Sequence, residues 1–382
     1  MGSMFRVKSI FKNPLLLLGI LLVGLVLASC RAGLNAVPRG WAGGAIADGT
    51  LLIGSMEGKL VAVDVSDGSH LGEVILETPE TTGGGFSCAP ASTAVAIYGS
   101  PATSGDLVYV GGYNGKIYAF TFEGSGLRNE PRWVYPRQEN LGRVVGGLIV
   151  ARGKVYFGDA DGKVYALDAA DGFQEWAEPF ETGDKIWSTL AIDGDTLFVG
   201  SFDNKLYALN TTDGSKKWEF ETEGAIVSTP VVYDNTVYIG SFDRYLYAID
   251  ATDGTLKWKS MAENWFWAKP VISNGTVYAA NLDGKVYALD AESGNKLVEF
   301  DLGSPVSSSP VLAGDLVVVA SEDGIVYTLD TDNNQRRQLA SLEGKIYASL
   351  AADEGIVYIH TNKDTVYAID ARSGARRELS IK

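Results

Sequence analysis

Acidic side chains recur along this chain in a pattern that could serve metal binding or acid–base chemistry. They stand in two short motifs, typified by "DADGK" at Asp159–Lys163 and "ATDG" at Ala251–Gly254. A calcium loop needs more oxygen ligands at fixed spacing and a closing carboxylate, whereas Asp-Gly supplies the positive φ of a hairpin turn. Because the place of the first motif reads "MEGK", "YNGK" and "LDGK" elsewhere, we expect turns and no metal.

Cysteine and histidine side chains are few. The chain has two cysteines, Cys30 and Cys88, and two histidines, His70 and His360. A zinc site of the Cys/His type needs more such ligands at suitable spacing. Neither histidine stands in a motif that a Ser-His-Asp or Cys-His enzyme would use. We therefore expect no catalytic residues.

The bulk composition is that of a globular protein. The chain has 382 residues, enough to bury a large core, and a formal net charge of −15. Aromatic residues make up 10% of it and charged residues 21%, which argues against disorder. Nucleic-acid binding needs clustered Lys and Arg. Because no basic patch follows the first dozen residues, we expect no nucleic-acid partner.

The first thirty residues are typical of a secretion signal rather than of a fold. Three basic residues, Arg6, Lys8 and Lys12, precede the apolar run "PLLLLGILLVGLVLAS" at 14–29. The run ends in "LASC", which resembles a bacterial lipobox and implies that Cys30 receives a diacylglyceryl group before cleavage on its N-terminal side.

An uncleaved single-span anchor is the alternative for this segment, although the run is a little short for a span. We predict a signal peptide at 1–29 and a lipidated tether at 30–40. Both alternatives place the bulk of the protein outside the cytoplasm, attached to a membrane and facing the periplasm or the cell surface.

A unit of about forty residues recurs through the rest of the chain. Its "YAID"-type segments end at Asp64, Thr121, Asp168, Asn210, Asp250, Asp290, Asp330 and Asp370. Each unit begins with small residues and contains four short strands bounded by Gly, Asp and Asn turns, with no helical periodicity. Such units are typical of β-propeller blades. We predict an all-β fold, an eight-bladed propeller over 41–382, whose small-residue first strands crowd the axis.

The repeat "VYALDAxDGxxxW" resembles that of the pyrroloquinoline-quinone-type propellers, which include quinoprotein alcohol dehydrogenases and the propeller lipoprotein of the outer-membrane β-barrel assembly machinery. The resemblance covers Trp41–Lys382 and implies that an outer-strand Trp docks onto the neighbouring blade. This role falls to Trp133, Trp176, Trp218 and Trp258. Other blades carry Gly72, Val298, Gln338 and Glu378 in that column. We therefore expect weaker docking across blades six to eight.

The quinoprotein dehydrogenases of this family bind a quinone and Ca²⁺ with acidic and amide ligands, an Asp base and a vicinal disulfide. This chain has no Cys-Cys pair and lacks the long inserted loops that build that pocket. We therefore expect no cofactor. A PQQ-dependent oxidoreductase with calcium is the alternative.

The position three residues before the Pro column varies most between repeats. It holds Trp41, Tyr98, Val145, Trp187, Val227, Trp267, Ser307 and Tyr347. Five aromatic rings would line one end of the central channel. Blade six adds Trp265 and Lys269, and a charge near the axis is unfavourable unless it meets water or a partner. These residues either bind a peptide or small anionic ligand, or the rings pack between blades.

Two segments are less regular than the repeat. The insertion at 77–94 holds Cys88, either a buried free thiol or a site of intermolecular pairing, and loops of this length often carry function. The sequence shows no obvious strand shared between the two ends to close the ring, although 31–38 could add one.

From these observations we expect a non-catalytic cell-envelope lipoprotein that acts as a protein-interaction scaffold, in envelope or outer-membrane protein assembly. Its partners would be envelope proteins or peptides, together with the membrane through the lipid anchor, and the propeller would be monomeric. A PQQ-dependent oxidoreductase and a ligand-binding or sensing propeller are the alternatives.

Overall fold

The computed structural model describes residues 40–76, 95–123, 126–330 and 335–381. The chain divides into two compact units, of which residues 1–37 and 79–93 form the first. That unit lies outside the described ranges, as do Cys30, Cys88 and the 31–38 segment; the other unit contains the propeller. Its regular elements are all β-strands, and no helix in the described ranges is long and apolar enough to cross a membrane.

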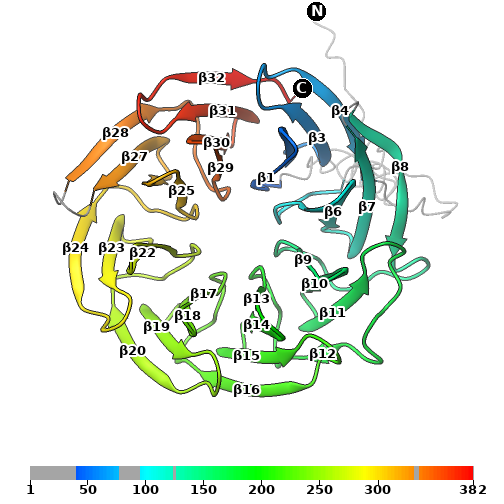
Figure 1. Ribbon diagram of the computed structural model, residues 1–382, viewed down its shortest axis with the longest axis horizontal. Helices are drawn as coiled ribbons and strands as arrows, with labels where there is room; N and C mark the ends of the chain where they lie inside the picture. The colour runs from blue at the N-terminus through cyan, green and yellow to red at the C-terminus, as the bar shows by residue number, and fades with distance from the viewer. Residues whose placement is uncertain (1–39, 77–94, 124–125, 331–334, 382) are drawn as a thin grey trace, which may run out of the picture. The chain divides into compact units, whose positions relative to one another are not determined.

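The strands form eight four-stranded antiparallel sheets arranged in a ring (Figure 1), which confirms the predicted all-β, eight-bladed propeller. The first four blades consist of β1 (Gly44–Ala47), β2 (Thr50–Gly54), β3 (Lys59–Asp64) and β4 (His70–Ile75); β5 (Ala102–Ser104), β6 (Leu107–Gly112), β7 (Lys116–Glu123) and β8 (Gly126–Tyr135); β9 (Ile149–Ala151), β10 (Lys154–Gly158), β11 (Lys163–Asp168) and β12 (Phe180–Glu181); β13 (Ala191–Asp193), β14 (Thr196–Gly200), β15 (Lys205–Asn210) and β16 (Lys216–Glu221).

The other four blades repeat the same plan. They consist of β17 (Val231–Tyr233), β18 (Thr236–Gly240), β19 (Tyr245–Asp250) and β20 (Leu256–Met261); β21 (Val271–Ser273), β22 (Thr276–Ala280), β23 (Lys285–Asp290) and β24 (Lys296–Asp301); β25 (Val311–Ala313), β26 (Leu316–Ala320), β27 (Ile325–Asp330) and β28 (Gln335–Ser341); β29 (Ala351–Asp353), β30 (Ile356–Thr361), β31 (Thr365–Asp370) and β32 (Arg376–Leu379). In each blade the first strand lies nearest the axis (Figure 1).

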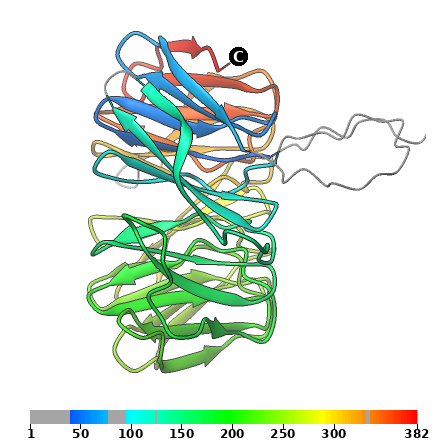
Figure 2. The ribbon, with the colours of Figure 1, turned by 90° about the vertical axis from the view of Figure 1, so that its right-hand side faces the viewer.

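The blade-to-blade segments and the turns between second and third strands lie on one face of the ring, which we call the mouth face. Backbone hydrogen bonds join these segments to these turns; for example, the Phe242 N–H donates to the Ala225 carbonyl at 2.9 Å. The remaining turns lie on the opposite face, since consecutive strands are antiparallel. Figure 2 shows the ring edge-on, with the strands running between its two faces.

Alternate residues of each blade enter two different hydrophobic cores, one on each side of the sheet. In blade five, Val237 and Ile239 pack with blade four, whereas Tyr238 between them packs with blade six. Successive side chains of a strand point to opposite faces, and full burial of side chains of this size contributes roughly 1.5–3 kcal/mol each. The cores therefore lie between blades, and a blade is completed only by its two neighbours.

The small residues expected in the first strands lie just before them instead. In blade five the strand β17 begins at Val231, after Pro230, which has no N–H to offer a strand ladder. The preceding Ser228 is buried and donates its hydroxyl to the Ala268 carbonyl of the next blade at 2.9 Å. The small residues therefore line the axis as an irregular segment, which was not predicted.

Four tryptophans near the rim contact the next blade in one way. Their indole N–H groups donate to carbonyls 3.0–3.2 Å away: Trp133 to Ala169, Trp176 to Thr211, Trp218 to Ala251 and Trp258 to Ala291. Each ring lies against the glycine of that blade's next turn. At Gly254 the φ is +77°, and an added Cβ would lie 2.7 Å from Trp218. We call this contact the Trp–Gly lock.

The column assigned to Gln338 and Glu378 was wrong by one residue. Strand pairing sets Arg337 opposite Thr328 and Arg377 opposite Ala368, where other blades place Trp. The Arg337 guanidinium donates to the Ala371 carbonyl at 3.1 Å, the atom equivalent to the carbonyls that accept from the tryptophans. Arginine therefore replaces the indole as the donor in blades seven and eight. Among blades six to eight of the described chain, only blade six, with Val298 at this position, lacks a side-chain hydrogen bond to a carbonyl of the next blade.

The ring closes between blades eight and one without a shared strand in the described residues, because every blade is built from consecutive strands. Arg377 donates to the Ser66 carbonyl at 2.7 Å and also to the Val65 carbonyl. On the mouth face, the Met56 N–H donates to the Asp364 carboxylate at 3.0 Å. A shared core that includes Leu379 and Ile381 completes the junction.

Replacing Trp176 by alanine is expected to lower the free energy of unfolding by about 3–5 kcal/mol, because it removes a buried indole and its N–H bond. The matched control is Trp265→Ala, at a side chain that is 46% exposed. It should lose clearly less than Trp176→Ala, because nearly half of this side chain is already exposed and its stacking on Phe242 adds only about 0.5–1.5 kcal/mol to the area it buries. Equilibrium urea unfolding measures both, and equal losses would contradict the docking role of Trp176.

The corrected register predicts that Arg377→Ala destabilises the protein and Glu378→Ala does not. Arg377 joins blade eight to blade one through two carbonyls, and we expect a loss of about 1–2 kcal/mol for this half-buried charged donor. The adjacent Glu378 is exposed and should change stability by less than about 0.5 kcal/mol. The same urea titration compares them, and a larger loss for Glu378→Ala would restore the original register.

Candidate functional site: the central channel

The recurring acids act on the backbone of their own turns. Asp159 accepts the N–H groups of Asp161, Lys163 and Gly142 at 2.9–3.2 Å, and Gly162 has φ +82° in the hairpin between β10 and β11. At Asp250, hydrogen bonding from the Thr252 N–H holds the carboxyl pKa below its usual value. The "DADGK" and "ATDG" motifs are thus turns, as predicted.

The eight blade-to-blade segments enclose a central channel with two connected parts. The part at the mouth face has a volume of about 300 Å³ and is lined by all eight residues of the variable column. The part toward the opposite face measures about 480 Å³ and is lined by the irregular segments just before the first strands and by the beginnings of several of those strands. Seven residues line both parts and form what we call the junction ring: Ser100, Gly147, Thr189, Thr229, Lys269, Ser309 and Ser349.

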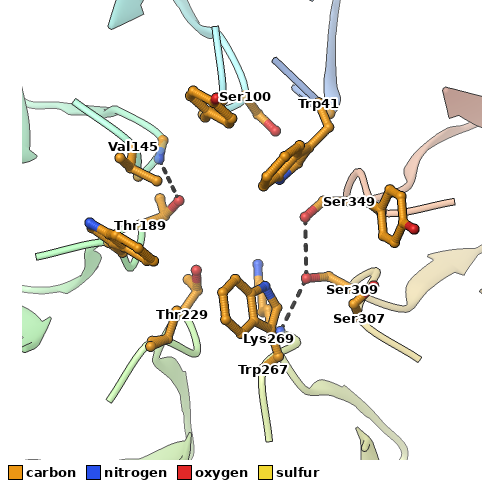
Figure 3. A pocket seen from close by; sticks show the side chains of 18 of the residues that line it. Trp41, Ser100, Val145, Thr189, Thr229, Trp267, Lys269, Ser307, Ser309 and Ser349 are labelled. Atoms are coloured by element: carbon orange, nitrogen blue, oxygen red, sulfur yellow. Dashed lines mark hydrogen bonds between the residues drawn. The ribbon is translucent and has the colours of Figure 1, made fainter. Parts of the chain in front are cut away.

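Hydroxyl groups dominate the junction ring (Figure 3). The backbone N–H of Lys269 donates to Ser309 Oγ at 3.1 Å, and the Ser349 hydroxyl donates to the same oxygen at 3.3 Å. Across the channel, the Gly147 N–H donates to Thr189 Oγ1 at 2.8 Å. A hydroxyl that accepts one such bond still carries a proton to donate. The ring therefore presents several hydroxyl donors around one opening.

Lys269 is the one charged residue that lines either part of the channel in the described chain. Its side chain extends from the wall toward the middle of the cavity (Figure 3). The side chain is exposed to the open channel, yet the surrounding blades displace much of its hydration. This desolvation lowers the pKa of the Lys269 ammonium below its ordinary value of 10.5.

Aromatic rings surround the channel above the junction ring. Trp41 packs edge-on against Tyr98, with 4.8 Å between ring centroids, and lies 6.3 Å from Tyr347. Trp187 and Trp267 line the same cavity from blades four and six. Trp41, Tyr98 and Tyr347 thus pack against one another across blades, and all five rings form part of the cavity wall.

A row of aromatic side chains continues outward from the channel on the mouth face. It consists of Trp187, Phe202, Phe242, Trp265 and Trp267, which we call the aromatic arc. Phe242 stacks on Trp265 at 4.5 Å and on Trp267 at 5.7 Å between centroids, and Phe202 lies 4.8 Å from Trp187. Trp265 therefore belongs to the arc but does not line the cavity.

Sequence reasoning missed three aromatics near this site: Phe202, Phe242 and Tyr113. Phe202 and Phe242 lie in the turns "SFDN" and "SFDR", and Tyr113 lies in the corresponding turn of blade two. Comparing these turns between repeats could have found them, because the same place holds Leu282 and Glu322 in blades six and seven.

The two histidines line neither part of the channel, although His360 lines a neighbouring pocket together with Trp41 and Tyr347. His70 lies on the outer strand β4, with Nε2 3.8 Å from Glu73. His360 is buried in blade eight, and its Nε2 lies 3.0 Å from Asp364. No group of three or more His, Cys, Asp or Glu side chains that could hold a metal occurs among the residues described.

The channel residues do not fit a calcium-bound quinone. Calcium takes oxygen ligands, chiefly carboxylates and amide or backbone carbonyls, and no Asp, Glu, Asn or Gln side chain is among the described residues that line the channel. The donor set is one ammonium group and several hydroxyls.

These features define a closed eight-bladed propeller with a hydroxyl-lined channel that carries one lysine. A family model described as the β-propeller of the beta-alanine-activating enzyme matches residues 155–382. Because this match covers more than half of the chain, the chain belongs to that β-propeller family. A second model, described as outer membrane protein assembly factor BamB, matches residues 35–178. It confirms the resemblance predicted from the repeat.

Solved structures share the fold. BamB from Moraxella catarrhalis matches with a TM-score of 0.68 and 22% identity, over 85% of this chain and 92% of that chain. The computationally designed protein Ika8 matches with a TM-score of 0.67 and 15% identity, over 90% and 97%. A comparison with curated proteins found no match. At these identities the structural matches establish the fold and nothing more.

Replacing Lys269 by methionine is expected to raise the free energy of unfolding at neutral pH, because it removes a desolvated charge. The folded-state pKa of Lys269 is lowered, so the wild type gains stability as the pH rises through that pKa toward 10.5. The advantage of the variant should therefore shrink over that range. Urea unfolding between pH 7 and high pH measures this difference.

Lys216→Met is the matched control for that substitution. Lys216 lies on the outer strand β16, with Nζ 2.7 Å from Glu219, so its replacement should not raise stability at any pH. A Lys269→Met protein less stable than the wild type at neutral pH would show that Lys269 stabilises the fold.

Proposed function

We propose that this protein is a non-catalytic cell-envelope lipoprotein that serves as a protein-interaction scaffold in outer-membrane protein assembly. The observation that carries the proposal is the match of residues 35–178 to the model of an outer membrane protein assembly factor. The fold shared with BamB over 92% of that chain agrees with it. The propeller works as a monomer and binds envelope proteins or peptides, with no nucleic acid.

The composition of the channel supports a non-catalytic role. The family model over 155–382 is named after an enzyme, but a fold does not carry an activity without its site. Among the described residues that line the channel there is no Asp, Glu, His or Cys to act as base or nucleophile. Lys269 and the hydroxyls can bind a ligand; Lys269 is the one candidate general base in the described lining, and no carboxylate or imidazole of that lining orients it.

The aromatic arc is the surface that we assign to the partner protein. Trp265 is 46% exposed and stacks on Phe242, so the arc presents wide, rigid apolar area in a fixed arrangement. Lys185, with Nζ 4.0 Å from the Phe202 ring centroid, adds a charge at one end. Tryptophan and other aromatics are enriched at the centres of protein interfaces. The partner would place apolar side chains against this arc.

Attachment to the membrane follows from the "LASC" segment. Cys30 stands directly after the apolar run at 14–29, and the acylated cysteine would hold the propeller at the membrane on the extracytoplasmic side. Two or more acyl chains make such attachment effectively stable, since each buried methylene contributes about 0.8 kcal/mol.

Cys30→Ala is expected to abolish lipidation, so that the protein is either released from the membrane fraction or retained as an unprocessed precursor. Membrane fractionation together with intact-mass spectrometry distinguishes these results. Cys88→Ala, the same change at the other cysteine of the chain, is the control; it should keep the lipid-derived mass and the membrane fractionation, and differ in mass only by the lost sulfur atom. Normal processing and attachment in Cys30→Ala would remove the lipoprotein proposal.

A Phe242→Ala/Trp265→Ala double variant is expected to reduce crosslinking to outer-membrane assembly proteins at least tenfold, because it removes the stacked pair of the aromatic arc. Crosslinking in intact membranes, followed by affinity capture and mass spectrometry, measures the yield. The control is Phe173→Ala/Tyr233→Ala, which removes two aromatics, 58% and 44% exposed, from the opposite face. Equal capture by both folded variants, or none by the wild type, would contradict the proposal.

A further inference from the structure

We propose that the central channel binds a monocarboxylate that carries a small apolar or aromatic body, with the carboxylate at Lys269 and the body between the rings at the mouth. This site lies inside the ring and needs no partner protein on the aromatic arc, so it goes beyond the scaffold function.

The charge at the junction ring points to a monoanion. Lys269 is the one charged residue among the described residues that line either part of the channel. An ammonium without a carboxylate beside it is unfavourable in a desolvated place, and desolvation already lowers its pKa. One carboxylate group would neutralise the charge of the Lys269 ammonium. A ligand with two or three negative charges would leave the rest unpaired in a chain whose net charge is −15.

The hydroxyls complete an oxyanion site around that charge. Thr229 and Ser309 come from the blades on either side of Lys269 and line both parts of the channel, and Ser349 from the next blade donates its hydroxyl to Ser309 Oγ at 3.3 Å. Ser309 Oγ accepts a bond from the backbone N–H of Lys269, which leaves the Ser309 hydroxyl proton free to donate. A carboxylate accepts several bonds of this kind, and those from charged donors are the strong ones.

The cavity above the junction ring sets the nature of the body. Its wall includes the rings of Trp41, Tyr98, Trp187, Trp267 and Tyr347, and its volume is about 300 Å³. That volume is at the lower end of small-molecule sites, so the body is no larger than one aromatic or branched aliphatic group with its attachment. Such a carboxylate occurs in a free acid and also at the C-terminal residue of a peptide chain, and both present the same chemistry to Lys269.

Isothermal titration calorimetry of the full chain with defined probes tests the proposal. The probes are phenylacetate, phenylacetamide, and the peptide Gly-Gly-Phe with a free or an amidated C-terminus. We expect the carboxylates to bind and the two amides to bind at least tenfold more weakly. Tighter binding of phenylacetate assigns a free acid, and tighter binding of the peptide acid assigns a chain end. Equal binding of acids and amides, or binding of neither acid, overturns the proposal.

Variants separate the site from general charge effects. Lys269→Met should weaken phenylacetate binding at least tenfold, and Lys269→Arg should retain most of it, because the cation remains. Lys216→Met makes the same chemical change at the rim and should leave the affinity unchanged. Undiminished binding to folded Lys269→Met overturns the site. Carboxylate binding lost in Lys269→Met while partner crosslinking persists would separate this site from the scaffold function.

Discussion

Each sheet of this protein carries apolar side chains on both of its faces, and the structure depends on burying both faces against neighbouring blades. Val237 and Tyr238 are adjacent in one strand, yet they enter cores shared with different blades. No blade can bury both sets by itself, so the ring must close. Closure rests on the junction between blades eight and one, where Arg377 reaches the carbonyls at the start of the blade-one turn. Hydrophobic burial and rim hydrogen bonds act together there.

The rim and the axis perform different tasks with the same repeat. At the rim the Trp–Gly lock requires a glycine in the left-handed region, since a Cβ at Gly254 would strike Trp218. At the axis eight copies of one irregular segment converge, so the residues that differ between repeats lie next to one another around the channel. Lys269 therefore faces serines and threonines from other blades. Variation that would be scattered over a solvent surface in another fold is gathered here into one channel.

Much of the architecture was predictable because turn chemistry and strand alternation are local properties. Asp-Gly turns and strand order follow from residues within one repeat, whereas the docking role of the tryptophans came from the family resemblance. The strand register at Gln338 could not be predicted in this way, because the register shift in β27 lies between Val326 and Tyr327. In β19 the equivalent shift lies between Ala248 and Ile249. Aligning the repeats at a constant spacing cannot reveal where a β-bulge lies, because a bulge at either of the two positions fits the same pattern of residues.

The sequence by itself determined the class of fold, the number of blades, the role of the acids in turns and the column of residues that vary. The tertiary structure decided that this column and Lys269 line one cavity, that Phe242 joins Trp265 in an arc, and that arginine replaces tryptophan at the ring junction. The physical reason is distance along the chain. Residues forty or more positions apart come together only when the ring closes, and closure is a property of the packed blades.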